Sequence, residues 1–220
     1  MRAEELISEM IPPIKFSETG DKALNWMNEF RVSHLPVVEK GEYIGLISEN
    51  DIYDMPDPSK KLKDHFAALP RPFIYADRHV YELMKVIADH KITVVPILSE
   101  ENEYLGCTDL LYLMSQITAI NSINEPGGIL VLEMNQHDYT LTQIARIVEE
   151  NNAKILSSFI TSLPESTQIE VTLKINTTDL DRIIQTFQRY DYHIKETYQK
   201  SKFHDDLKKR YDELMNFLNM

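Results

Sequence analysis

The feature that most constrains this 220-residue chain is a segment that occurs twice. The stretch FRVSHLPVVEKGEYIGLISENDI (residues 30–52) aligns with HKITVVPILSEENEYLGCTDLLYL (residues 90–113). Pro36 aligns with Pro96, and Gly45 aligns with Gly106 after a one-residue insertion in the intervening turn. Two copies of one segment predict two copies of one supersecondary unit, packed against each other.

Each copy begins with a segment of helical apolar spacing, DKALNWMNEFRV in the first and RHVYELMKVIADHKI in the second. The expected apolar faces are Ala23, Leu24, Met27 and Phe30 in the first helix and Val80, Leu83, Met84 and Ile87 in the second. Two apolar runs follow in each copy, separated by a polar turn. Each copy therefore predicts the order helix, strand, turn, strand, helix.

The paired segments resemble CBS motifs, and residues 1–120 together resemble a CBS-pair (Bateman) module. The resemblance rests on the strands HLPVV and VVPIL and on the ending GLISEND, which has a glycine, two apolar residues, a hydroxyl residue and, three positions after the hydroxyl residue, an aspartate. It implies a regulatory module that binds an adenosine-containing ligand in clefts between the motifs. The expected ligand is an adenine nucleotide (AMP, ADP or ATP) or S-adenosylmethionine, without any metal.

Ser48 and Asp51 close the first copy at the point where a strand gives way to a helix. A serine there can cap the helix, whose free N–H groups attract phosphate. An aspartate one turn later can accept hydrogen bonds from a ribose diol. The alternative is purely structural: Ser48 is then an N-cap, and Asp51 is a favourable acid in the first helical turn.

The remaining expected ligand contacts are cationic side chains and the strands themselves. Arg31 and Lys91 occupy matching positions before the two strands and, like His34, can neutralise phosphate; each is also typical of a solvated surface. By resemblance, the walls of the nucleotide site are formed by Leu35, Pro36, Val37 and Pro96.

The second copy departs from this pattern. Without a gap, Asp109 takes the hydroxyl position and Tyr112 takes the aspartate position; with a shift of one, Thr108 and Leu111 take them. Neither register restores the carboxylate that accepts a diol. One nucleotide per chain is therefore expected, beside Asp51.

A different pattern follows the breaker-rich linker NSINEPGG, residues 121–128. The periodicity of residues 129–200 predicts the order β-α-β-β-α-β, which is the ferredoxin-like arrangement. The fold class is thus α/β in the broad sense (α+β). Residues 201–220 predict an amphipathic helix with Phe203, Leu207, Tyr211, Leu214 and Leu218 on one face.

Residues 129–200 resemble an ACT domain, a small regulatory module that often binds amino acids at a dimer interface. The loop after its first strand offers Asn135, His137 and Asp138 as polar candidates. Tyr139 stands where that family has a glycine, and a side chain there fills space that a ligand needs. Turn and N-cap chemistry is the competing interpretation of the three polar residues.

Composition excludes some function classes. The net charge of −12 argues against DNA or RNA as a partner. No apolar run reaches the roughly 18 residues of a membrane span, and the N-terminus lacks the pattern of a signal peptide, so a cytoplasmic protein is expected. Cys107 stands alone in an apolar context and is interpreted as a buried side chain rather than a nucleophile.

The resemblance to CBS pairs and ACT domains implies a regulatory homodimer. An enzyme is not expected, because no phosphate loop, zinc-protease motif or nucleophile elbow is present. The two modules in this order resemble the accessory proteins of acetoin utilisation, although no residue identifies acetoin as a ligand. Two alternatives stay open: an interaction scaffold with decayed ligand sites, and an amino-acid sensor that acts through the ACT-like domain.

Overall fold

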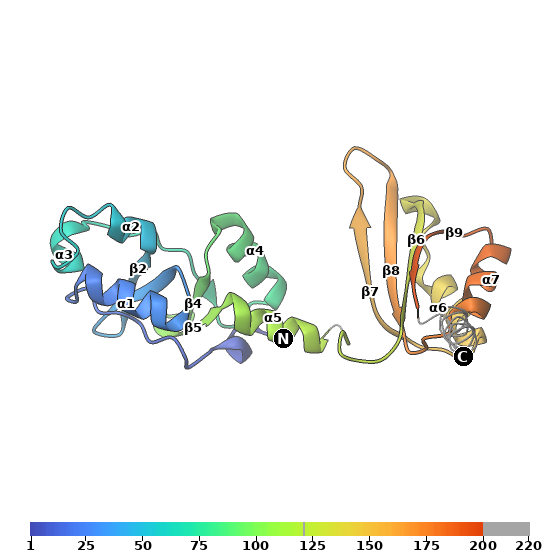
Figure 1. Cartoon of the computed structure of the whole chain (residues 1–220), viewed down its shortest axis with the longest axis horizontal. Helices are drawn as coiled ribbons and strands as arrows, with labels where there is room; N and C mark the ends of the chain where they lie inside the picture. The colour runs from blue at the N-terminus through green and yellow to red at the C-terminus, as the bar shows by residue number, and fades with distance from the viewer. Residues whose placement is uncertain (121, 200–220) are drawn as a thin grey trace, which may run out of the picture. The chain divides into compact units, whose positions relative to one another are not determined.

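The computed structural model describes residues 1–120 and 122–199, and the expected helix at 201–220 lies outside these residues. The chain forms two compact units, the first comprising Met1–Ile117 and the second beginning at Thr118 (Figure 1). Each unit has its own hydrophobic core. The mixed α+β fold class predicted from the sequence is confirmed.

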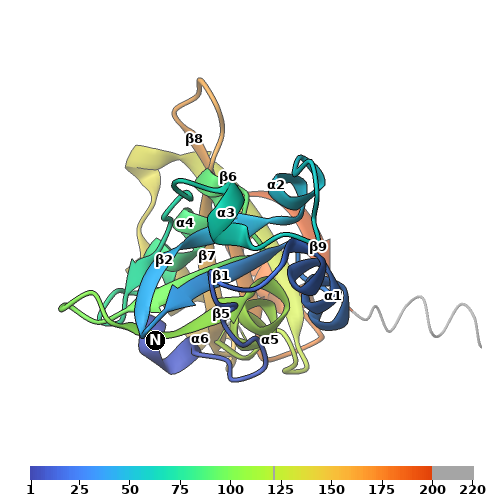
Figure 2. The same ribbon diagram turned by 90° about the vertical axis from the view of Figure 1, so that its left-hand side faces the viewer.

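The first unit contains the two predicted repeats in the predicted order. The first repeat consists of α1 (Gly20–Phe30), β1 (His34–Glu39), β2 (Glu42–Ser48) and α2 (Glu49–Tyr53). The second consists of α4 (Val80–His90), β4 (Val94–Leu98), β5 (Tyr104–Asp109) and α5 (Leu110–Ile120). In the first repeat, α1 packs against both α2 and β1 (Figures 1 and 2).

Contacts between equivalent residues relate the two repeats by an approximate twofold axis. Tyr43 and Tyr104 stack with ring centroids 6.3 Å apart. Glu42 and Glu103 form an antiparallel bridge across the two hairpins. Arg31 and Lys91 end α1 and α4 in the same left-handed conformation, with φ of 56° and 53°.

The repeat extends further toward the N-terminus than the sequence comparison indicated. Ile14 bridges Val37 in parallel, as Ile74 in β3 (Ile74–Tyr75) pairs with Ile97 of β4. Two short helical turns are exchanged between the repeats. The turn η1 (Ala3–Leu6) packs with the core of the second repeat, and α3 (Leu62–His65) packs with that of the first.

The predicted apolar helix faces are largely confirmed. Ala23 and Met27 are buried on α1, and Val80 and Leu83 are buried on α4. Met84 was wrongly included, since its side chain is 40% exposed. Helical spacing gives the direction of a side chain only to within about a quarter turn, so a residue at the edge of the apolar face can be either buried or exposed.

The second unit has the predicted β-α-β-β-α-β order. Its elements are β6 (Gly128–Asn135), η2 (Gln136–Asp138), α6 (Leu141–Glu150), β7 (Ile155–Ser162), β8 (Gln168–Ile175), α7 (Asp181–Arg189) and β9 (His193–Tyr198). The antiparallel sheet has the order β7-β8-β6-β9. Helix α7 begins after Leu180, and the hydroxyl of Thr177 accepts the Asp179 N–H in the preceding turn.

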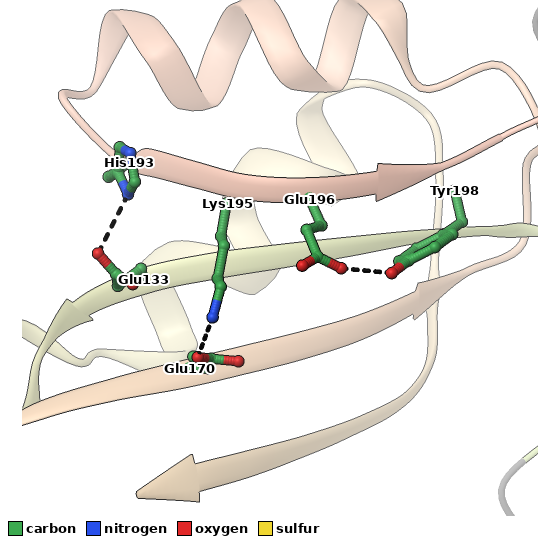
Figure 3. Close-up of polar contacts among 6 residues, drawn as sticks. All are labelled: Glu133, Glu170, His193, Lys195, Glu196 and Tyr198. Atoms are coloured by element: carbon green, nitrogen blue, oxygen red, sulfur yellow. Dashed lines mark hydrogen bonds and ion pairs between the residues drawn. The ribbon is translucent and has the colours of Figure 1, made fainter. Parts of the chain in front are cut away.

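The helices α6 and α7 cover one face of this sheet (Figure 1) and enclose its apolar core. The opposite face carries alternating charges (Figure 3). There His193 lies 3.5 Å from Glu133, and Lys195 pairs with Glu170. Among the described residues, no helix has both the length and the apolar character required to cross a membrane.

Candidate functional site

Ser48 and Asp51 meet at the start of α2, as the sequence predicted. Ser48 ends β2 and is the N-cap residue of the helix. Its hydroxyl accepts the Asp51 N–H at 3.1 Å and donates to Asp51 Oδ2 at 2.6 Å. The Ser48 N–H also donates to Asp51 Oδ2, at 2.8 Å. The pair is therefore a reciprocal capping box, with one carboxylate oxygen committed to the helix end.

Asp51 Oδ1 is the available half of the carboxylate. No residue in the described ranges 1–120 and 122–199 donates a hydrogen bond to it. Each carboxylate oxygen has two lone pairs, so Oδ1 can accept both hydroxyls of a diol or one of them. A geometry in which both carboxylate oxygens hold the diol would require the capping box to open.

His34 lies beside this pair. It begins β1 and stands opposite Ser48 in the register of the two strands. Its Nδ1 accepts the backbone N–H of Thr93 at 3.3 Å and lies 3.1 Å from the Thr93 hydroxyl. Because Nδ1 accepts, the neutral ring carries its proton on Nε2. Three predicted site residues, Ser48, Asp51 and His34, are thus brought together at a contact between the repeats.

The sequence comparison missed the residues that join the repeats at this point. The Ser33 N–H donates to the Thr93 hydroxyl at 3.0 Å. The carbonyl groups of Ser33 and Thr93 accept the first N–H of α2 and of α5, from Glu49 and Leu110. Ser33 and Thr93 are equivalent positions in the repeat alignment, so a hydroxyl residue before each strand was the signal that could have identified them.

Burial controls the protonation of His34. Loss of solvent lowers the pKa of His34 below 6.5, and the nearby charge of Asp51 acts in the opposite direction. The ring is therefore neutral at neutral pH. Protonation would place a hydrogen on Nδ1 facing the Thr93 N–H, which removes the contact between the repeats.

Acidification is expected to destabilise the first unit through His34. The unfolded chain binds a proton near pH 6.5, and the folded chain binds it only at lower pH. The stability that neutral His34 contributes is therefore fully present above about pH 6.5, and it is lost as the pH falls from 6.5 through the lower pKa of the folded state. Denaturant unfolding at about pH 7.5 and about pH 5.5 measures the loss. His34→Gln should flatten this dependence, whereas His90→Gln, at an exposed position, should leave it unchanged. If His34→Gln loses as much stability between the two pH values as the wild-type protein does, His34 is not the group responsible.

The predicted cations lie at exposed helix ends. Arg31 and Lys91 are the C-cap residues of α1 and α4. Within the part of the chain that the structure describes, neither forms an ion pair with an acidic side chain. Both side chains are available to an anion, but among the described residues neither forms an ion pair with Asp51.

The predicted strand contacts are part of the core. Leu35 and Val37 are fully buried and pack with the residues of α1. Pro36 and Pro96 are also buried, and the carbonyl group of Pro36 accepts the Ile14 N–H at 2.8 Å. Alternation along β1 places Leu35 and Val37 on the same face of the strand, which faces this core. A ligand would therefore find backbone here rather than the side chains of Leu35 and Val37.

The structure resolves the register of the second copy. Asp109 Oδ1 accepts the Tyr112 N–H at 2.9 Å, as the Ser48 hydroxyl accepts the Asp51 N–H. The gap-free alignment is thus correct. Val94 pairs with Asp109 where His34 pairs with Ser48. This half of the unit lacks both the imidazole and the diol-accepting carboxylate.

In the second unit, part of the predicted polar loop borders a cavity of about 630 Å³. Asn135 and Asp138 line it, and the Asn135 amide donates to Asp138 Oδ2 at 3.3 Å. Gln143, Tyr190 and His193 also contribute to its wall. His137 is not among the lining residues. Tyr139 packs against the core, which accounts for a tyrosine in place of glycine.

Two other chemistries find no support in the described part of the chain. Cys107 is fully buried, and burial raises the pKa of its thiol to about 11, so it is a poor nucleophile. Within residues 1–120 and 122–199, no group of three or more His, Cys, Asp or Glu side chains is arranged to hold a metal ion.

Comparison with known proteins gives partial matches. The inosine-5'-monophosphate dehydrogenase of Methanocaldococcus jannaschii is 25% identical over 143 residues, which is 63% of this chain and 28% of that protein. The enzyme of the same name from Korarchaeum cryptofilum is 27% identical over 105 residues, 48% of this chain and 22% of that protein. The chain spans about a quarter of the length of these relatives.

Among similar solved structures is a CBS domain pair/ACT domain protein from Thermotoga maritima, with a TM-score of 0.48 and 18% identity, covering 54% of this chain and 98% of that one. Another is the cytosolic domain of a Mg²⁺ channel in complex with ATP, with a TM-score of 0.43 and 19% identity, covering 52% and 48%. The family model of the CBS domain matches residues 3–56. The expected CBS motif is therefore confirmed for the first repeat.

Proposed function

We propose that this chain is a regulatory protein that senses an adenosine-containing ligand, an adenine nucleotide or S-adenosylmethionine, in its first unit. The contact of His34 with Thr93 beside Asp51 carries the proposal. A ligand on Asp51 Oδ1 would lie where the two repeats are hydrogen-bonded to each other. CBS domains commonly bind adenosine ligands, and the family model matches this repeat.

Ligand binding at this position can act as a signal because the repeats meet through few polar contacts. Ser33, His34 and Thr93 form one hydrogen-bonded group across the boundary. A ligand that interacts with Asp51 and displaces or strengthens this group binds two arrangements of the repeats with different affinities. That difference in affinity is the whole of the free energy available to shift their equilibrium.

A thermal-shift screen with AMP, ADP, ATP, S-adenosylmethionine and single amino acids tests the proposal. A ligand at about 100 times its dissociation constant stabilises the folded protein by about 2.7 kcal/mol. We expect an adenosine compound to raise the melting temperature of the first unit. If none of the four adenosine compounds raises the melting temperature, the result favours the interaction scaffold. The closed capping box at Ser48 is the observation that supports this alternative.

Asp51→Asn is expected to weaken binding of the adenosine ligand roughly ten- to a hundredfold, because a hydrogen bond to a charged acceptor is lost. Asparagine keeps an oxygen that can accept the Ser48 N–H, so the helix cap is retained. Asp54→Asn, at the exposed C-cap of the same helix, is the matched control. Calorimetry on the three proteins measures the dissociation constants. Equal affinities would remove Asp51 from the site.

The cavity of the second unit supports a second candidate, an amino-acid sensor in an ACT-like domain. It is lined by Asn135 and Asp138, whose carboxylate can pair with an ammonium group. The amino acids in the screen test this candidate separately. A shift produced by an amino acid and abolished by Asp138→Asn, but not by Asp51→Asn, would assign it to this unit.

We infer that the chain forms a homodimer through the edge strand β7. Residues 155–162 contain no charged side chain, and Phe159 and Ile160 are 57% and 47% exposed. Uncharged, exposed edges are ready to pair with another strand. Light scattering at micromolar concentration should give twice the chain mass of 25.7 kDa, and Ile160→Lys should shift the mass toward the monomer. A wild-type mass near 25.7 kDa would exclude the dimer.

A further inference from the structure

Helix α7 has a polar face that borders a second cavity of about 640 Å³. Ile183 and Phe187 are buried in the core of the second unit on the opposite face. The cavity is lined by Asn151, Arg182, Gln185, Thr186, Gln188 and Arg189. Five of these lie on α7, and Asn151 follows the end of α6. Every lining side chain can donate a hydrogen bond.

The charge of this cavity is opposite to that of the chain. None of its lining residues is acidic, although the chain has 35 acidic against 23 basic residues. Arg2, Arg78 and Arg146 each pair with an acidic side chain, Arg146 with Glu150 at 2.7 Å. Within the described ranges, neither Arg182 nor Arg189 forms an ion pair. Two guanidinium groups are therefore available to an external anion.

Hydrogen bonds fix the floor of this cavity. Thr186 is only 4% exposed, and its hydroxyl donates to the carbonyl oxygen of Arg182 at 2.8 Å. The Thr186 hydroxyl oxygen in turn accepts a hydrogen bond from the Arg189 guanidinium at 3.0 Å and one from the Asn151 side-chain amide at 3.2 Å. Arg189 thus uses one of five donors to hold its position and keeps the others. A guanidinium held in advance loses less conformational entropy on binding.

We propose that this α7 cavity binds a small polyanion, a phosphoryl or carboxylate compound, between Arg182 and Arg189. Guanidinium groups pair with both oxyanions through two parallel hydrogen bonds. The two arginines are seven residues apart, which separates their backbones by about 10.5 Å along the helix. An anion whose oxygens are distributed over several ångströms fits this separation better than a single small ion. The inference is independent of the nucleotide site at Asp51.

Amide chemical-shift titration of the full chain tests the proposal, with pyrophosphate and citrate as probes that lack adenosine. At low ionic strength, where charges are least screened, one probe should shift residues 182–189 and the Asn151 side-chain amide in a saturable manner. Stronger binding of pyrophosphate identifies a phosphoryl ligand, and stronger binding of citrate identifies a carboxylate ligand.

Three variants decide whether the arginines are responsible. Arg182→Gln and Arg189→Gln should each weaken binding roughly tenfold or more, the usual effect of losing a charge-assisted hydrogen bond. Arg146→Gln removes a charge of the same unit outside the cavity and should leave the affinity unchanged. The proposal is overturned if neither probe gives saturable shifts at these residues, or if all three variants weaken binding equally.

Discussion

Phe187→Ala is expected to lower the free energy of unfolding of the second unit by roughly 3–5 kcal/mol. Phe187 is fully buried on α7, and its ring meets that of Tyr192 edge to face at 5.3 Å. Removing the ring loses its burial and leaves a cavity that a close-packed core fills only in part. Because typical domains are stable by only about 5–15 kcal/mol, this loss is a large fraction of the total.

Hydrogen exchange measures this effect separately in each unit. Amides of residues 122–199 should exchange faster in the variant, whereas those of the first unit, which has its own core, should not change. Leu141→Ala replaces a side chain of the same unit that is 46% exposed, and should change stability by less than about 0.5 kcal/mol. Faster exchange throughout the first unit would show that the two units unfold together.

Gly45→Val is expected to destabilise the first unit by about 3 kcal/mol, at the upper end of the overpacking range. A Cβ atom at Gly45 would lie 2.6 Å from Leu69 Cβ and 2.8 Å from the carbonyl oxygen of Pro70. The segment that contains Leu69 and Pro70 crosses over Gly45 and cannot move away easily, because the same Pro70 oxygen accepts the Leu46 N–H at 2.8 Å. The backbone must therefore shift to admit the side chain.

Gly41→Asn is the control for this substitution. Gly41 has a φ of +87°, and no atom lies within 4 Å of its added Cβ. Asparagine adopts the left-handed region more readily than other residues, so the cost should stay below about 1 kcal/mol. Denaturant midpoints of the two variants compare the effects. If the two variants have equal denaturant midpoints, the close contact of Gly45 with Leu69 and Pro70 does not restrict the size of the side chain at this position.

The repeat predicted more of the first unit than any local signal did. It gave the element order and the equivalence of Gly45 and Gly106. Each glycine lies beneath a segment from elsewhere in the unit: Leu69 approaches Gly45, and Ile7 approaches Gly106. These crossing segments were not predicted, because η1 and α3 carry short, weakly periodic sequences. Their positions depend on long-range pairing, which apolar spacing does not record.

The candidate site was predicted in its residue types but only partly in its bonding. The Ser48–Asp51 spacing correctly predicted an N-cap. It did not reveal that the two side chains satisfy each other, since a capping box and a ligand site have the same sequence pattern. The Thr93 contact was missed because it joins residues about 60 positions apart. The anion cavity on α7 was also missed, since its two arginines occur in an ordinary amphipathic helix.

The central claim is a single ligand site beside Asp51. The most direct test is a calorimetric titration with whichever adenosine compound raises the melting temperature most. The first repeat offers Asp51 and His34, whereas the second has Tyr112 and Val94 at the equivalent positions. We predict one ligand per chain, with an affinity that falls in Asp51→Asn and persists in Asp54→Asn. Two equal sites per chain, or one site indifferent to Asp51→Asn, would contradict the account.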